Sequence, residues 1–279
     1  MTHTTDPSEI PFERLPDGFA ERVEAPPEPA TPRPAATLVL MRRADPRGDG
    51  LEVLLVRRVR STGFVPGAWV FPGGRVDRSD GGETLLDLLA PSSAATTPGC
   101  PDDYLVAAIR EAFEETGILV ARDAQGIRVP TAAADTEIDQ WRERLLAGES
   151  TFLELLRKEN LRMDRTALGY IAHWITPEPE PRRYDTRFLA AAVPASTEAR
   201  IHEVEISHES WLSPEVALER HAAGELPMVF PTVKTLEALR PFDTPEAVLD
   251  HFREMEIPAT RPRLVRTPTG IGIRMPDEE

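Results

Sequence analysis

The sequence has a single cysteine, Cys100, among its 279 residues. One thiol excludes an intrachain disulfide, the six histidines are dispersed, and no zinc-ligand spacing is present. No apolar run approaches the ~20 residues that a membrane-spanning helix needs, and the first residues lack the charged-then-apolar pattern of a secretory signal. These absences predict a cytoplasmic protein with no membrane partner and no structural zinc.

Positive charge is also scarce. The chain has 47 acidic against 32 basic residues and a net charge of −15. A general nucleic-acid-binding protein depends on a basic face, so nucleic acid is not an expected partner. A small polyanion remains compatible, because metal ions neutralise phosphates locally. The basic residues near the segments discussed below form two clusters: Arg57, Arg58, Arg60 and Arg75, and then Arg182, Arg183 and Arg187.

Composition divides the chain into three parts. A hydrophobic content of 41% can fill a core, and the 28 prolines concentrate in the N-terminal region and in loops. Residues 1–34 are expected to be a flexible, Pro-rich arm, residues 35–240 the main domain, and residues 241–279 a C-terminal extension. Within this extension, residues 263–274 are expected either to add an edge strand or to cross to the partner subunit of a homodimer.

Hydrophobic periodicity predicts an alternation of strands and helices. Strands are expected at 36–42, 52–57, 68–71, 170–175, 187–193 and 203–212. Helices are expected at 104–116, 136–146, 151–160, from 214 and at 232–240. This order suits an α/β fold, in which a mixed sheet lies between helices as an α/β/α sandwich.

The most informative segment is residues 110–117, Arg-Glu-Ala-Phe-Glu-Glu-Thr-Gly. Glu111, Glu114 and Glu115 stand at i, i+3 and i+4, so a helix gathers them in one arc of about 100°. Val106, Ile109 and Phe113 fall on the opposite side, which is the packed face. Hard divalent cations bind such clusters of carboxylate oxygens, and the segment therefore predicts a metal site. The alternative is an acidic helix face in solvent.

A second segment, Pro72-Gly73-Gly74, follows a short apolar strand. Proline ends the strand, and paired glycines allow backbone geometry that a side chain would forbid. A carbonyl exposed at Gly74 is therefore a candidate metal ligand or phosphate neighbour.

Together these segments resemble the signature of the Nudix hydrolase family: Gly, five residues, Glu, seven residues, then Arg-Glu-x-x-Glu-Glu-x-Gly and an apolar residue. Gly74 begins the pattern, and residues 110–118 match its closing half at every specified position. There are two departures. Asp80 stands where the signature has its first Glu, and 29 residues (81–109) separate it from Arg110 instead of seven. The extra residues, 81–103, read as an inserted surface loop with a short helix.

Further segments are similar to the branch that includes the peroxisomal coenzyme A diphosphatases, which have a long insertion in this signature. They are Trp174-Ile175-Thr176-Pro177, residues 182–189 and Trp211-Leu212-Ser213-Pro214. Residues 54–74 match the coenzyme A motif of these relatives only in part. The resemblance implies a hydrolase that splits the diphosphate linkage of a nucleoside diphosphate derivative with Mg²⁺ or Mn²⁺. Coenzyme A or acyl-coenzyme A is the expected substrate. Nucleotide sugars, ADP-ribose and dinucleotides are alternatives, as is a non-catalytic nucleotide-binding regulator.

The resemblance also suggests roles for residues. Glu111, Glu114 and Glu115 are expected as catalytic metal ligands, completed by Gly74, with Glu111 either ligating a metal or orienting the water. Arg110 either belongs to the catalytic set or pairs with an acidic neighbour and holds the loop.

Other side chains are open to two interpretations. Alignment on Trp211 points to Glu205 as a further catalytic carboxylate, with Glu203 and Glu209 as rivals; the alternative is an exposed strand acid. Asp77 and Asp80 are interpreted either as holding water or metal, or as capping turns. Four arginines are expected to bind the phosphates of the substrate, unless they form loop salt bridges: Arg57, Arg75, Arg182 and Arg183.

Overall fold

Two apolar strands, β2 (Arg33–Arg43) and β3 (Leu51–Arg58), are central to the sheet. Leu38 to Met41 are fully buried in β2, and β3 buries Val53 to Val56 in the same way. The two strands are antiparallel, with Met41 opposite Val53. The computed structural model describes residues 9–46, 49–59, 67–89, 99–128 and 131–277.

The chain divides into two compact units. The larger unit comprises Ala35–Ala172 and Arg187–Ile257, and the smaller one Met1–Pro34, His173–Thr186 and Pro258–Glu279. This division differs from the expected one in two places. The segment 173–186 groups with the chain termini, whereas residues 241–257 group with the main domain because α8 (Pro245–Phe252) buries Val248 and Phe252 there.

The sheet of the larger unit follows the order β10-β3-β2-β9-β8. Two short strands pair alongside: β4 (Trp69–Val70) with β3, and β5 (Gly73–Arg75) with β2. The remaining members are β8 (Leu168–Ile175), β9 (Tyr184–Ala192) and β10 (Ile206–Leu212). Both antiparallel pairs and a parallel pair occur in the eight-stranded sheet, which confirms the expected mixed sheet.

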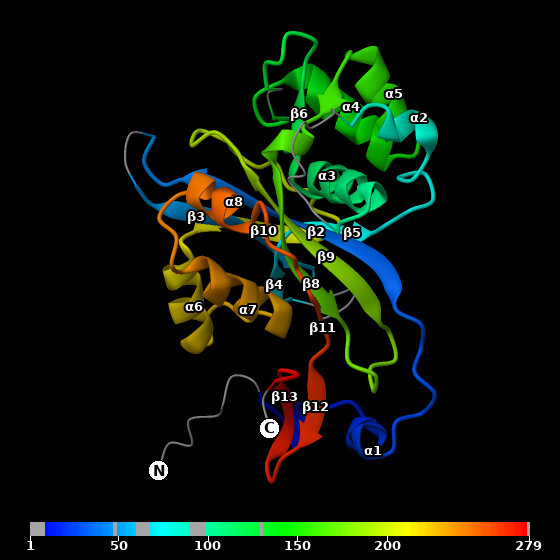
Figure 1. The fold of residues 1–279 in the computed structure, drawn as a ribbon, viewed down its shortest axis with the longest axis vertical. Helices are drawn as coiled ribbons and strands as arrows, with labels where there is room; N and C mark the ends of the chain where they lie inside the picture. The colour runs from blue at the N-terminus through cyan, green and yellow to red at the C-terminus, as the bar shows by residue number, and fades with distance from the viewer. Residues whose placement is uncertain (1–8, 47–48, 60–66, 90–98, 129–130, 278–279) are drawn as a thin grey trace. The chain divides into compact units, whose positions relative to one another are not determined.

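Helices cover both faces of this sheet (Figure 1). One face carries α2 (Glu83–Leu86), α3 (Asp102–Thr116), α4 (Thr136–Leu146) and α5 (Phe152–Lys158). The other carries α6 (Pro214–Ala222) and α7 (Phe230–Leu239). The predicted α/β class is confirmed. Later in the sequence than α3, β6 (Ala121–Arg122) and β7 (Arg162–Met163) pair to form a small two-stranded sheet. A 3-10 turn, Arg165–Ala167, then leads into β8.

The inserted segment is only partly a surface loop. Its expected short helix is α2, and residues 90–98 lie outside the described residues. Cys100, expected in an exposed loop, is instead 8% exposed and belongs to the hydrophobic core with Tyr104 and Leu105. The insertion therefore contributes apolar side chains to the core beside the start of α3.

The smaller unit joins the two ends of the chain. Here β1 (Glu9–Pro11) and β12 (Arg263–Arg266) pair on either side of β13 (Gly270–Arg274). A 3-10 turn, Phe12–Arg14, and α1 (Phe19–Glu24) follow β1. Residues 9–24 thus differ from the expected flexible arm, because β13 supplies backbone partners to β1. The C-terminal segment pairs within its own chain, and β11 (Ala259–Thr260) runs parallel to the end of β8.

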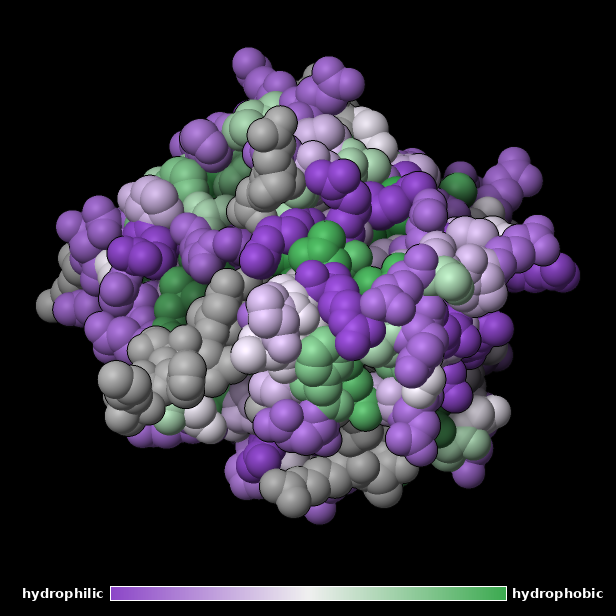
Figure 2. Space-filling model, turned by 90° about the horizontal axis from the view of Figure 1, so that it is seen from below, coloured by the Kyte–Doolittle hydropathy of each residue, from purple (hydrophilic) through white to green (hydrophobic). Residues whose placement is uncertain are grey.

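Hydrophilic side chains predominate on the face drawn in Figure 2, where hydrophobic residues form separate small patches. This pattern agrees with the 28% of charged residues in the sequence. Among the helices of the described ranges, none combines the length and apolar composition required to cross a bilayer.

Candidate active site

Helix α3 positions the three glutamates of the signature. Ile109 and Phe113 are fully buried in the core, so the opposite face of the helix carries the carboxylates. The side chains of Glu111 and Glu114 are 17% and 24% exposed, and Glu115 is buried. The helix ends at Gly117, whose φ of 71° is the left-handed conformation that favours glycine. The predicted helix and its acidic face are therefore present.

The glycine segment passes directly over these carboxylates. The backbone N–H of Gly73 donates a hydrogen bond to Oε2 of Glu115 at 3.1 Å. A Cβ atom added to Gly74 would lie 2.4 Å from Oε2 of Glu111, so this carboxylate would have to move. Glycine therefore lets the strand β5 approach the acidic face of α3 without displacing Glu111.

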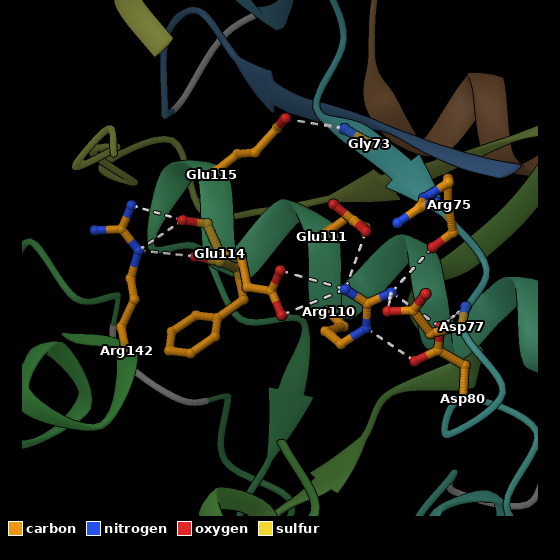
Figure 3. A network of polar contacts seen from close by, with 10 residues as sticks. Gly73, Arg75, Asp77, Asp80, Arg110, Glu111, Glu114, Glu115 and Arg142 are labelled. Carbon is orange, nitrogen blue, oxygen red and sulfur yellow. Dashed lines mark hydrogen bonds and ion pairs between the residues drawn. The ribbon is translucent and has the colours of Figure 1, made fainter. Parts of the chain in front are cut away.

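Arg110 forms the centre of a buried ionic network (Figure 3). Its Nε and Nη2 donate to the two carboxylate oxygens of Asp80 at 2.8 and 2.9 Å, and Nη2 also donates to the carbonyl of Arg75 at 3.0 Å. Nη1 donates to Glu111 at 3.0 Å and to Glu114 at 3.3 Å. Asp80 is fully buried and also accepts the backbone N–H of Asp77. This bidentate pair joins the glycine loop to α3.

This geometry bears on the two interpretations of Arg110 and of Asp80. Every polar group of the Arg110 guanidinium faces the loop or the helix, which supports the positioning role. Asp80 occupies the place of the first Glu of the signature and serves as the partner of Arg110. Asp77 is largely exposed and lies 3.8 Å from Arg110.

Burial makes the carboxyl groups of α3 difficult to ionise. It raises the pKa of Glu115 to about 8, an effect that the charge of Arg58 opposes and that of Glu111 reinforces. It raises the pKa of Glu111 to about 7, against the charge of Arg110. Burial raises the pKa of Glu114 as well. A nearby cation would relieve this cost, since it stabilises the ionised form of each group.

The carboxylate oxygens of the site are the ligands that a hard divalent cation prefers. The side chains that carry them are, however, not gathered around a common point. No three His, Cys, Asp or Glu side chains in the described part of the chain are arranged to hold a metal ion. Glu111 and Glu114 point to Nη1 of Arg110, and Glu115 points to Gly73 (Figure 3). A metal ion would therefore have to compete with these hydrogen bonds.

A loop that follows β9 in the chain brings Glu205 to the same helix. The N–H of His202 donates to the carbonyl of Glu115 at 3.0 Å, and the N–H of Arg200 donates to that of Thr116 at 2.8 Å. The charge of Glu205 is among the causes that raise the pKa of Glu115. Glu205 is exposed, as are the two rival acids, Glu203 and Glu209, so exposure does not separate the three.

The expected phosphate-binding arginines differ in their surroundings. Arg57 is partly buried and donates to the carbonyl of Gly67 at 3.3 Å, and Arg75 is exposed. Arg182 and Arg183 belong to the smaller unit. Arg182 is exposed, and Arg183 is buried and donates to backbone carbonyls of that unit, which supports a loop-holding role. Arg60 lies outside the described residues.

Two arginines near the site were not among the residues chosen from the sequence. Arg58, in the first basic cluster, interacts electrostatically with Glu115. Arg142 of α4 is 1% exposed and donates to the carbonyls of Phe113 and Glu114, at the end of α3. The sequence does contain a signal for it, because Arg142 lies four residues after Ile138, on the apolar face of its helix.

Comparisons with known proteins show the family of the chain. A family profile described as the NUDT19 Nudix domain matches residues 94–239, and the chain therefore belongs to the Nudix family. The acyl-coenzyme A diphosphatase NUDT19 of Xenopus laevis is 27% identical over 212 residues, covering 63% of this chain and 56% of the relative. The human protein of the same name is 27% identical over 218 residues, covering 65% and 58%.

These two curated relatives are longer, and the chain matches less than two thirds of their length. A solved structure is similar over a larger share of its length. The crystal structure of a NUDIX hydrolase from Alicyclobacillus acidocaldarius is 31% identical, with a TM-score of 0.65, covering 79% of this chain and 96% of that one.

Proposed function

We propose that this protein hydrolyses the diphosphate linkage of a nucleoside diphosphate derivative with the help of Mg²⁺ or Mn²⁺. One observation supports this most directly: three carboxylates on one turn of α3 are held against a glycine backbone by the pair of Arg110 and Asp80. A helix face that only interacts with solvent needs neither the buried ion pair nor the close approach of Gly74.

Glu111, Glu114 and Glu115 would hold the cation, with the carbonyl of Gly74 as a further oxygen donor. A divalent cation in this place neutralises phosphate charge and makes bound water more acidic. Membership of the Nudix family supports a metal-dependent reaction, and the choice between Mg²⁺ and Mn²⁺ is part of the proposal.

The residues of the chain supply positioning and proton transfer. The oxygen of a water molecule forms a bond to one phosphorus, and the bond between that phosphorus and the bridging anhydride oxygen breaks. A carboxylate accepts the proton that the water loses, and we assign this role to Glu205 or Glu111. The departing group leaves as a phosphate. Arg57, Arg58 and Arg75 would balance its charge.

The proposed substrate is coenzyme A or an acyl-coenzyme A. The names of the curated relatives and the long insertion within the Nudix signature support this choice. Nucleotide sugars, ADP-ribose and dinucleotides have the same diphosphate chemistry and are the comparison compounds. A regulator that only binds nucleotides is the alternative from another class.

The test is a panel assay. Purified protein is incubated with Mg²⁺ or Mn²⁺ and each diphosphate compound, and the products are separated by chromatography. We expect turnover of coenzyme A derivatives to the 3′,5′-ADP and phosphopantetheine products of diphosphate cleavage. If only another diphosphate compound were turned over, that compound would take the place of coenzyme A as the proposed substrate. Binding without turnover of any compound would favour a non-catalytic nucleotide-binding regulator.

A carboxylate variant tests the metal assignment. Glu114→Gln should lower kcat at least about 100-fold, because it removes one negative ligand from the cation site. Glu219→Gln, in an exposed position of α6, serves as the matched control and should keep full activity. Mn²⁺ binding, measured by electron paramagnetic resonance, should weaken in the first variant alone. Equal Mn²⁺ affinity in both variants would contradict the assignment.

A further inference from the structure

The larger unit contains a cavity of about 200 Å³ next to the segment that follows α3. Its apolar wall consists of Ile118, Leu119 and Val120 together with Val193, which follows β9. These four side chains are between 2% and 9% exposed, so they are held by the surrounding core. None of the residues assigned above to metal or substrate lines this cavity. It is referred to below as the Arg128 cavity.

Arg128 lines the same cavity and has no acidic partner among the described residues. Its guanidinium donates a hydrogen bond to the carbonyl of Ala192. The nearby acid, Asp164, pairs with Arg122 at 2.6 Å. Partial burial and the charge of Arg122 lower the pKa of Arg128, and the charge of Asp164 opposes this shift. Because Asp164 is already paired with Arg122, the guanidinium of Arg128 has no ion pair of its own within the described residues.

Such an arrangement is unfavourable without an anion. A partly desolvated charge is costly unless it is paired, and a guanidinium pairs best with a planar carboxylate through two parallel hydrogen bonds. Thr131, Ser196 and Thr197 also line the cavity, and the four residues of its apolar wall favour an alkyl group rather than a bare inorganic ion. Charge and hydrophobicity thus point to one amphipathic class of ligand.

The volume of the Arg128 cavity limits the size of the ligand. A cavity of about 200 Å³ is smaller than the ~300–1,000 Å³ sites that take drug-sized molecules. It is close to the ~150 Å³ apolar cavity that accommodates benzene. A ligand of about eight non-hydrogen atoms therefore fits.

We infer that the Arg128 cavity binds a short-chain aliphatic monocarboxylate, with its carboxylate on Arg128 and its alkyl chain against Ile118, Leu119 and Val193. The inference does not depend on the proposed hydrolase activity, because binding requires neither the metal nor the carboxylates of α3.

The test uses sodium hexanoate and the full chain labelled with ¹³C in its methyl groups. We expect saturable chemical-shift changes at the methyl groups of Ile118, Leu119, Val120 and Val193. Hexan-1-ol, which has the same chain without the charge, should bind at least about tenfold more weakly. Inorganic phosphate should cause no shifts at these methyl groups. The absence of saturable shifts with hexanoate, or equal affinity for hexan-1-ol, would overturn the inference.

Three variants locate the site. Arg128→Met should reduce hexanoate affinity at least about tenfold, since it removes the cation. Arg220→Met removes an exposed arginine of α6 and should leave the affinity unchanged. Arg128 also donates to the carbonyl of Ala192, so its loss could disturb the local structure. A second variant therefore keeps Arg128: Ala134→Trp places a large side chain at an exposed position of the cavity lining and should block binding. Wild-type affinity in Arg128→Met or in Ala134→Trp would refute the proposed site.

Discussion

The guanidinium of Arg110 and the carboxylate of Asp80 are joined by two hydrogen bonds of 2.8 and 2.9 Å, although they lie 30 positions apart in the sequence. This pair fixes the glycine loop to α3 across the whole inserted segment. The insertion therefore changes the connection between the halves of the signature and leaves their contact intact. Asp80 forms this bidentate pair although the signature has the longer Glu at its position.

Asp80→Asn should be strongly destabilising. It removes the negative partner of a buried arginine, a change that costs about 3–5 kcal/mol in comparable buried ion pairs. Asp77→Asn is the matched control, because Asp77 is largely exposed and lies 3.8 Å from the same guanidinium. We expect its cost to stay below about 1 kcal/mol. Urea denaturation followed by circular dichroism measures both, and similar losses for the two variants would contradict the proposed importance of Asp80.

Gly74→Ala should impair activity more than stability. The added methyl group would lie 2.4 Å from Oε2 of Glu111 and would push this carboxylate away from its place. We expect kcat to fall at least about tenfold, since small displacements of catalytic groups are costly. In Gly81→Ala the nearest atom to the new methyl group is 3.6 Å away, and this variant should behave as wild type. A Gly74→Ala enzyme with full activity would show that the close approach is not needed.

Arg142→Met should loosen the end of α3. Arg142 donates to the carbonyls of Phe113 and Glu114. Its loss removes this donor from Glu114, whereas Phe113 still accepts the N–H of Gly117. The expected decrease in the free energy of unfolding is about 1–3 kcal/mol. Arg144→Met, on an arginine of the same helix that stacks on Trp141, is the control and should cost less. Amide hydrogen exchange should show faster opening at residues 113–117 only in the first variant.

Local patterns made the acidic helix predictable. The i, i+3 and i+4 spacing of Glu111, Glu114 and Glu115 depends only on helix geometry, and the apolar face of α3 follows from the same periodicity. Signature spacing placed Asp80 at the acidic position. Its complete burial was not predictable, because burial depends on how the inserted segment packs, and the same is true of Cys100.

Contacts between distant parts of the chain had no comparable signal in the sequence, because no local pattern of residues predicts them. The pairing of β1 with β13 joins Ile10 to Ile271, and nothing in the Pro-rich N-terminal sequence indicates that partner. The sequence alone suggests that Arg183 binds phosphate. Its hydrogen bonds to the carbonyls of Ala30 and Thr176 form only in the folded chain and could not be predicted from the sequence. The position of Glu205 beside α3 likewise depends on the bond between His202 and Glu115.

The thiol of Cys100 should react slowly in the folded protein. Burial raises its pKa to about 12, with the charge of Arg187 opposing this shift. The thiolate is the reactive form, and a higher pKa lowers its population at any given pH. At pH 8 only about one thiol in 10,000 is ionised at such a pKa, against about one in four for a free cysteine of pKa ~8.5.

Labelling with iodoacetamide, followed by mass spectrometry of the whole chain, measures this effect directly because the sequence contains no other cysteine. The rate in native buffer should be at least about 100-fold lower than in 8 M urea, and it should increase about tenfold for each pH unit between 8 and 10 while the fold persists. Equal rates in native buffer and in urea would mean that Cys100 is accessible as a thiolate. In that case the inserted segment would not be packed beside the start of α3.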